Sequence, residues 1–127
     1  MTVCLDSWAI LRWLEGAEPA AGRVEAAMAD RPVVSWVTVG EVACVVERAA
    51  GPREARRTVR DLRACMRFDL PSEMRVLQAA AIKARHPMAY AEAFAVATAR
   101  AHGCGLLAGD PAVVSADAGW DVVDLGA

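Results

Sequence analysis

The sequence predicts an α/β fold of three layers (α/β/α), in which helices cover both faces of a mostly parallel sheet of four to five strands. Short strand-like runs alternate with longer segments whose apolar residues recur at helical spacing. Glycine, proline or capping residues separate most of these segments. The resulting order, β-α-α-β-α-α-β-α-α-β-α-β, requires right-handed crossovers and therefore implies a mostly parallel sheet.

The predicted strands are short and place two acidic residues at the same edge of the sheet. They cover residues 2–5, 33–36, 67–70, 105–108 and 121–125. Asp6 directly follows the first strand, and Asp110 follows the fourth within Gly109-Asp110-Pro111. In such sheets ligands bind at the carboxyl ends of the strands, near the point where strand order reverses. We therefore expect Asp6 and Asp110 to converge there.

The predicted helices carry recognisable start and stop signals. Ser7 caps the first helix, which ends at Gly16, and Ser72 caps a later one. Gly51 and Gly103 end two others. Six of the helices in this order lie within residues 7–16, 18–29, 38–50, 53–66, 72–85 and 90–102.

Composition narrows the class of protein. At 127 residues the chain is expected to form a single domain, residues 1–127. Its 56% hydrophobic content suggests that a partner covers part of the surface, although alanine contributes much of that figure. The net charge of −2 excludes binding to nucleic acid through overall charge. Any contact with a polyanion must therefore use a local basic patch.

The cysteines and the start of the chain predict a reduced, cytoplasmic protein with no membrane partner. Cys4, Cys44, Cys65 and Cys104 are widely spaced and form no C-x-x-C pair, so we interpret them as small buried hydrophobic residues. The chain enters its first strand without a signal peptide. No apolar run is long enough to cross a bilayer without including charges.

Four carboxylates lie where a strand is predicted to stop or a helix to start, and each has a structural interpretation. Asp6 can cap the first helix, and Glu41 can complete a capping box that begins at Thr38. Glu92 falls in the first turn of a helix, where an acid complements the helix dipole. Asp110 is an ordinary turn residue. Taken singly, each is better explained by structure than by catalysis.

Together, the four carboxylates predict a metal site. Brought to one sheet edge, they would repel one another unless a cation neutralised them. Hard oxygen ligands of this kind suit Mg²⁺ or Mn²⁺. Such ions can activate a water and stabilise the leaving oxygen of a phosphodiester. The predicted chemistry is metal-assisted hydrolysis of a nucleic-acid backbone.

Four motifs then make the chain resemble a known family. They are Val3-Cys4-Leu5-Asp6-Ser7, the run from Val34 to Val42, the run from Pro87 to Ala99, and Leu106-Leu107-Ala108-Gly109-Asp110-Pro111. In this order and spacing the chain resembles PIN-domain proteins, and closely the VapC toxins of bacterial toxin–antitoxin pairs. The resemblance implies a PIN-like fold and a metal-dependent endoribonuclease that hydrolyses RNA, often tRNA. It also implies a small VapB-like antitoxin and a homodimer.

The family's metal ligands carry over onto Asp6, Glu41, Glu92 and Asp110, and the resemblance implies that the hydroxyl of Ser7 orders a metal-bound water. The chain departs from the family pattern at the third acid, which is usually aspartate and is here Glu92. It also has Ala108 and Ala112 where a hydroxyl and a further acid are often found. The alternative is therefore a catalytically impaired module that keeps the PIN fold and binds RNA or an antitoxin.

The remaining charged and aromatic residues leave two questions open. Six arginines recur at three- and four-residue intervals, and most of them share one face of the predicted helix at 53–66: Arg53, Arg56, Arg57, Arg60, Arg63 and Arg67. They form either a solvated face or a phosphate-binding stripe, with Arg53, Arg57 and Arg60 as the main RNA-binding candidates. Trp8, Trp13 and Trp36 are interpreted as core or self-association residues. We expect neither His86 nor His102 near the acids, so a histidine general base is not predicted.

A phospho-acceptor domain is excluded by residues that can be read directly. A receiver-like domain needs an adjacent acidic pair and a late lysine, but the only lysine is Lys83, in mid-chain. A phosphatase-like domain needs an acid two residues after the first aspartate, and Trp8 occupies that position.

Overall fold

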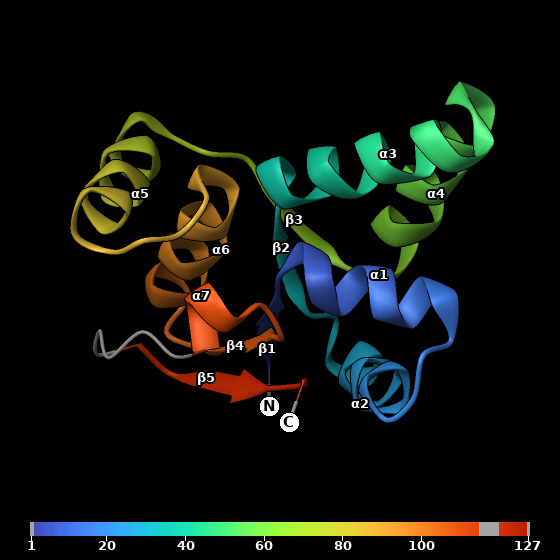
Figure 1. The fold of residues 1–127 in the computed structure, drawn as a ribbon, viewed down its shortest axis with the longest axis horizontal. Coiled ribbons are helices and arrows are strands. Elements are labelled where there is room, and N and C mark those ends of the chain that lie inside the picture. Colours follow the sequence, from blue (N-terminus) through green and yellow to red (C-terminus); the bar gives the residue numbers. More distant parts are fainter. Residues whose placement is uncertain (1, 115–119, 127) are drawn as a thin grey trace.

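The computed structural model describes residues 2–114 and 120–126 and has a five-stranded sheet at its centre (Figure 1). The strand order is β3-β2-β1-β4-β5, and every neighbouring pair is parallel. The strands are β1 (Val3–Leu5), β2 (Val33–Ser35), β3 (Arg67–Asp69), β4 (Gly105–Ala108) and β5 (Val122–Asp124). The helices are α1 (Ser7–Glu15), α2 (Ala20–Ala27), the 3₁₀ turn η1 (Met28–Asp30), α3 (Trp36–Ala50), α4 (Pro52–Cys65), α5 (Glu73–Arg85), α6 (Tyr90–Ala101) and α7 (Pro111–Val114).

Helices cover both faces of the sheet, which confirms the three-layer α/β/α prediction. Successive side chains of a strand point to opposite faces. Cys4 and Leu106 are buried in a cluster with α5, α6 and α7. Leu5 and Leu107 are buried in a second cluster with α1, α2, α3 and α4. The central strands β1 and β4 therefore contribute to two separate cores.

Helix ends agree with the predicted stop signals, but the starts of α1 and α3 do not agree with the predicted caps. Asp6, not Ser7, caps α1, since the Asp6 side chain accepts a hydrogen bond from Ala9 N. Gly16 and Gly103 adopt left-handed backbone angles, φ 67° and φ 62°, directly after α1 and near the end of α6. Helix α3 begins at Trp36 because the Ser35 hydroxyl caps it, accepting a hydrogen bond from Val37 N at 3.1 Å. Glu41 is therefore the sixth residue of the helix. The predicted capping box from Thr38 to Glu41 is wrong.

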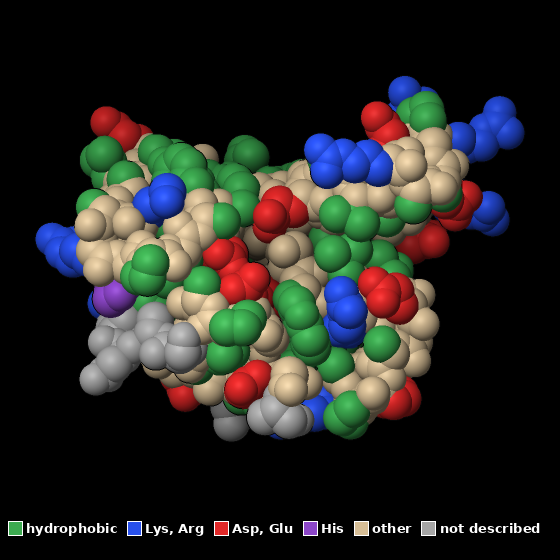
Figure 2. Space-filling view, in the orientation of Figure 1, with side chains coloured by type: hydrophobic (Ala, Val, Ile, Leu, Met, Phe, Trp, Pro, Cys, Tyr) green, Lys and Arg blue, Asp and Glu red, His purple; other side chains and the backbone are tan. Residues whose placement is uncertain are grey.

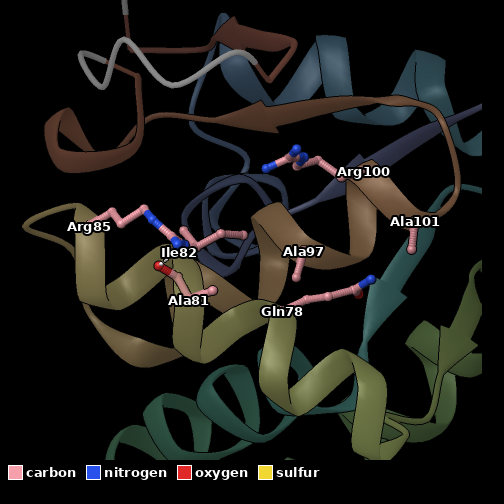
Figure 3. Close-up of a pocket in the computed structure, with 7 residues that line it drawn as sticks. All are labelled: Gln78, Ala81, Ile82, Arg85, Ala97, Arg100 and Ala101. Carbon is pink, nitrogen blue, oxygen red and sulfur yellow. Dashed lines mark hydrogen bonds between the residues drawn. The ribbon is translucent and has the colours of Figure 1, made fainter.

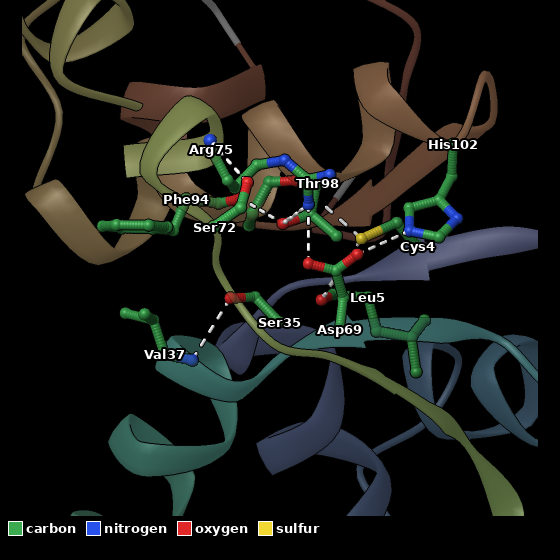
Figure 4. A network of polar contacts seen from close by, with 11 residues as sticks. Cys4, Leu5, Ser35, Val37, Asp69, Ser72, Arg75, Phe94, Thr98 and His102 are labelled. Carbon is green, nitrogen blue, oxygen red and sulfur yellow. Dashed lines mark hydrogen bonds and ion pairs between the residues drawn. The ribbon is translucent and has the colours of Figure 1, made fainter. Parts of the chain in front are cut away.

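A polar network fastens the edge strand β3 to the helices of one face (Figure 4). Arg75 Nη1 donates to Asp69 Oδ1 at 2.6 Å, and His102 Nε2 lies 2.7 Å from Asp69 Oδ2. Thr98 Oγ1 donates to the carbonyl oxygen of Phe94 at 2.7 Å and lies 3.5 Å from Arg75 Nη1. Because Asp69 ends β3 while Arg75 and His102 belong to α5 and the end of α6, the network joins three elements.

Two of the three tryptophans with a predicted packing role connect elements of the second core. Trp13 Nε1 donates to Glu25 Oε2 at 2.6 Å, which links α1 to α2. The rings of Trp36 and Phe68 meet edge to face with their centroids 4.8 Å apart. Both tryptophans pack against the cluster that contains Leu5. Trp8 also packs, partly buried, against this cluster, so the interpretation of the three tryptophans as core residues is confirmed.

The four cysteines are all free thiols, but they are not uniformly buried. Cys4 is fully buried, and this burial raises the pKa of its thiol well above the ordinary value. Cys65 and Cys104 are partly buried. Cys44 is exposed, contrary to prediction, because it lies on the side of α3 away from the buried Val39 and Val42.

Across residues 2–114 and 120–126, no helix has the length and apolar character needed to span a membrane.

Candidate metal centre

Asp6 and Asp110 meet where the strand order reverses, between β1 and β4, as the sequence predicts. Asp6 N donates to the carbonyl oxygen of Leu107 at 3.2 Å, which ties the end of β1 to β4. The Asp6 side chain is only 3% exposed, and its Oδ1 accepts a hydrogen bond from Ala9 N at 2.8 Å. Asp110 Oδ1 accepts from Ala112 N at 2.9 Å. Both aspartates therefore cap a helix, α1 or α7, and both caps use Oδ1.

Two glutamates approach the same place from helices α3 and α6. Glu41 is partly buried and accepts a hydrogen bond from the hydroxyl of Ser7. Glu92 Oε1 accepts from Ala89 N at 2.7 Å, so this side chain closes the first turn of α6, and its carboxyl group also hydrogen-bonds that of Asp110. Figure 2 shows acidic side chains gathered in a hollow between α1, α3 and α6.

The electrostatics of the hollow show that its carboxylates act on one another. Burial raises the pKa of Asp6 from 3.8 to about 7, and the charges of Glu92, Asp110 and Glu41 add to that rise, while the Ala9 amide opposes it. Burial and Asp110 also raise the pKa of Glu41. Burial raises the pKa of Glu92, with further contributions from Asp110 and Glu41. The fold thus holds four mutually repelling groups together, and neutralising them would relieve that repulsion.

The donor set fits a hard divalent cation, although its side chains are not already arranged as ligands. Carboxylate oxygens are the preferred ligands of Mg²⁺ and Mn²⁺. Within the described residues, however, no three acidic, histidine or cysteine side chains form a ready-made metal site. Glu92 is engaged by Ala89 N and by Asp110. Binding of a cation would require Glu92 to turn away from the Ala89 amide or to use its second oxygen.

The histidines and the α4 arginines lie away from the acids. His102 contacts Asp69, and the His86 ring packs edge to face against Trp120 with centroids 5.1 Å apart. These contacts agree with the prediction that neither histidine serves the acid cluster. The five arginines of α4 are exposed, and α4 lies beyond α3 on the side away from α6 (Figure 1): Arg53, Arg56, Arg57, Arg60 and Arg63.

A pocket of about 360 Å³ lies between α5 and α6, outside the acid cluster (Figure 3). It is lined by Gln78, Ala81, Ile82, Arg85, Ala97, Arg100 and Ala101. Arg85 Nη1 donates to the carbonyl oxygen of Ala81 at 3.2 Å, so this guanidinium is partly engaged by its own helix. None of the four carboxylates lines this pocket. The pocket therefore does not compete with the acid cluster as the candidate site.

One contact at the rim of the acidic hollow could not be found by sequence reasoning. The ring of Trp8 lies so close to Gly109 that a Cβ at this glycine would be 2.4 Å from ring atoms Cδ2 and Cε3. The guanidinium carbon of Arg12 lies 5.1 Å from the centroid of the Trp8 ring. The i,i+4 spacing of Trp8 and Arg12 is a signal for their own contact. Nothing in the sequence indicates the contact with Gly109.

Comparison with known proteins places this geometry in a family. The PIN domain family model matches residues 3–123. A toxin–antitoxin complex from Klebsiella pneumoniae is similar in structure, with 18% identity over 94% of this chain and 93% of that chain and a TM-score of 0.71. The toxin VapC20 of Mycobacterium tuberculosis, which cleaves the sarcin–ricin loop, has 19% identity over 89% and 93% of the two chains and a TM-score of 0.71. DNA-bound VapBC from Salmonella typhimurium has 15% identity over 95% and 96%, with a TM-score of 0.75. A search of curated proteins found no match.

At these identities the structural neighbours show a shared fold, and the family assignment rests on the match that covers nearly the whole chain. The parallel sheet of order β3-β2-β1-β4-β5 and the acids at its point of reversal agree with that match. The chain belongs to the PIN domain family, and its fold is that of the VapC-type proteins.

Proposed function

We propose that the chain is a divalent-metal-dependent endoribonuclease and the toxin of a VapBC-type toxin–antitoxin pair. The observation that carries this proposal is the convergence of four interacting carboxylates at the switch point of a parallel sheet. Burial raises the pKa values of Asp6, Glu41 and Glu92, so these acids are costly to ionise together without a cation. RNA is the proposed substrate, and tRNA is the first candidate because similar toxins often cut it.

The chain's own residues would divide the work of the site between holding a cation and orienting a water. Bound Mg²⁺ or Mn²⁺ would supply Lewis-acid stabilisation of the phosphate oxygens and lower the pKa of an attacking water. Asp6 and Asp110 accept backbone amides through Oδ1, and their second carboxylate oxygens would serve as ligands. Glu41 and Glu92 complete the proposed set. The Ser7 hydroxyl, which hydrogen-bonds Glu41, would orient the water.

An antitoxin and a second copy of the chain are the proposed protein partners. Large apolar side chains are exposed on α5 and in the loop before it, with Leu70 78%, Met74 68% and Leu77 63% exposed. Exposed apolar surface of this kind is typical of an interface. The structural neighbours from Klebsiella and Salmonella are toxin–antitoxin assemblies, which supports an antitoxin partner. Sedimentation of the purified chain, alone and with its co-expressed partner, would measure both associations.

The test of the proposed function is cleavage of RNA by the purified chain. Total RNA and defined tRNAs would be incubated with Mg²⁺, with Mn²⁺ or with EDTA, and the fragments mapped. Discrete fragments that require metal and disappear in Asp6→Asn would support the proposal. The exposed Asp61→Asn on α4 is the matched control, since it removes the same charge away from the hollow. Metal-independent cleavage, or cleavage that survives in Asp6→Asn, would contradict it.

The second candidate function is an impaired PIN module that binds RNA or an antitoxin without cutting. It is favoured by one observation, namely that Glu92 is engaged by Ala89 N in the position where the family usually has aspartate. We expect Glu92→Asp to lower cleavage by about tenfold, as losses at supporting metal-site residues do, because it draws the carboxylate away from Asp110. Initial rates at saturating Mg²⁺ measure this effect. A tenfold gain would instead show that the native site is impaired.

We further propose that Arg53, Arg57 and Arg60 contact RNA phosphates outside the site. All three are exposed on α4, and no contact with the acids is needed for this role. Replacement of the three by glutamine should reduce the slope of log binding constant against log salt by about 2, at roughly 0.7 per phosphate of a single strand. The slope is measured by fluorescence anisotropy of a labelled RNA at salt concentrations between about 50 and 200 mM. An unchanged slope would assign α4 to a solvated face.

A further inference from the structure

We propose that Arg12 binds a phosphate of the RNA strand next to the cleaved bond and that Trp8 is the positioning residue that holds it there. This inference rests on the proposed nuclease function and adds a subsite to it. It is carried by three residues at the rim of the acidic hollow that lie in succession, namely Gly109, Trp8 and Arg12. Each step of this succession is set by the fold.

The first step places Trp8 at the edge of the metal centre. Trp8 is two residues beyond Asp6, in the first turn of α1. Its ring packs against Gly109, the residue that precedes Asp110. The Trp8 ring therefore touches the turn that carries Asp110, and Trp8 itself belongs to α1, the helix that Asp6 caps. Trp8 is only partly buried.

The second step directs Arg12 toward the same rim. Arg12 lies one turn after Trp8, at a rise of roughly 6 Å along the helix axis. Because side chains on a helix lean toward its N-terminus, the arginine reaches back over Trp8 in the direction of Asp6. The distance of 5.1 Å from guanidinium carbon to ring centroid is that of a cation–π contact. Arg12 is the sole basic residue of α1.

The third step is that the charge of Arg12 remains free to bind a ligand. Its Nε is buried and finds no hydrogen-bond partner within the part of the chain that the structure describes. Its Nη1 lies 3.7 Å from Glu15 Oε2, and the Glu15 side chain is 55% exposed, so this ion pair is long and screened by water. The Arg12 side chain as a whole is 35% exposed, so a phosphate would bind through its Nη groups and not through the buried Nε.

The chemistry of the proposed substrate explains why such a residue is needed. A polyanion that approaches four carboxylates is repelled over distances of several ångströms before any cation contact forms. A guanidinium at the rim offsets that repulsion and, unlike an ammonium, can bind two phosphate oxygens at once. Trp8 contributes by limiting the freedom of the arginine, which lowers the entropic cost of forming the contact.

The test separates a phosphate contact from a structural role. A labelled single-stranded RNA 12-mer in EDTA would be the binding probe, with cleavage of a defined tRNA in Mg²⁺ measured in parallel. Arg12→Gln should weaken binding roughly fivefold to tenfold, as expected for one charge-assisted contact, and reduce the salt slope by about 0.7. In cleavage it should raise KM by a similar factor and leave kcat within about twofold, because it removes uniform binding. Arg12→Lys should keep the slope and restore part of the affinity.

Two further variants make the outcome decisive. Glu15→Gln removes the carboxylate that competes with RNA phosphate for Arg12, so it should strengthen RNA binding. This effect is opposite in sign to that of Arg12→Gln, and misfolding would not produce it. Arg23→Gln, at an exposed position on α2, is the matched control and should change neither slope nor KM. Unchanged affinity and slope in both Arg12→Gln and Glu15→Gln would overturn the proposal. Loss of binding in Arg12→Gln without any cleavage by the native chain would support the subsite and contradict the nuclease.

Discussion

Replacement of Asp6 by asparagine should abolish metal-dependent RNA cleavage and, in the absence of metal, stabilise the folded chain above pH 7. Cleavage should fall by at least about a hundredfold, because the variant removes the most buried of the proposed ligands. Asparagine is as good an N-cap as aspartate, so the hydrogen bond from Ala9 N can be kept. The change in stability then reports the cost of the buried charge.

The sign of the pH dependence follows from the direction of the shift. Burial, reinforced by the charges of Glu92, Asp110 and Glu41, raises the pKa of Asp6 to about 7, above the value of an unfolded aspartate. A raised pKa means that the folded state binds the proton more tightly, so this contribution to stability is full below about pH 4 and is lost as the pH rises to about 7. At about 1.4 kcal/mol per pKa unit, the ionised carboxylate costs at most about 4 kcal/mol at pH 8.

Urea unfolding in EDTA at pH 4, 6 and 8 would measure the difference between the variant and the native chain. We expect Asp6→Asn to unfold like the native chain at pH 4 and to be about 2–4 kcal/mol more stable at pH 8. Added Mg²⁺ should stabilise the native chain at pH 8 and leave the variant nearly unchanged. Asp61→Asn, on the exposed side of α4, should show neither effect. If Asp6→Asn were less stable than the native chain at pH 8, burial of the ionised Asp6 carboxylate would not be costing stability, and the prediction would be wrong.

The sequence was sufficient to locate the carboxylate of Asp6, because the position of Asp6 depends only on local signals. Asp6 and Asp110 follow short strands, and the carboxyl ends of parallel strands share one edge, so their meeting follows from the alternation of strands and helices. The start of α3 was harder to predict because Ser35 and Thr38 are both good capping residues. In the fold Ser35 is the cap, and Trp36, the first residue of α3, packs against Phe68, a contact between elements that propensity does not describe.

The contacts that arrange the site were beyond sequence reasoning for a related reason. Glu92 could be assigned to the first turn of a helix, but its hydrogen bonds to Ala89 N and Asp110 depend on how α6 meets the turn after β4. The contact between Trp8 and Gly109 joins residues at opposite ends of the chain. Such contacts arise from the order of strands in the sheet, and one sequence read for local pattern contains no signal for them.

That contact supports the second large prediction, which is that Gly109→Ala should damage both stability and cleavage. A Cβ at this position would lie 2.4 Å from the Trp8 ring, well inside the distance at which carbon atoms repel. Either the ring must leave its place or the turn that carries Asp110 must move. Relief by local shifts in a packed region typically costs about 1–3 kcal/mol. Because catalytic groups tolerate displacements of only about 0.5 Å, we expect cleavage to fall by at least about tenfold.

A double-mutant cycle identifies the ring as the cause. Trp8→Ala alone should weaken the second core and the Arg12 contact, but together with Gly109→Ala it removes the clash, so the double variant should be less destabilised than the sum of the two single variants. Gly40→Ala is the matched control, since a Cβ there meets nothing within 4 Å and the position is helical; it should stabilise the chain by about 0.5–1 kcal/mol. Additive effects at Trp8 and Gly109, or native cleavage by Gly109→Ala, would show that the ring can swing aside without disturbing Asp110. In that case the Trp8 ring would not hold Arg12 in place. We would then expect Arg12 to bind phosphate weakly, and it would not form the preorganised subsite inferred from the structure.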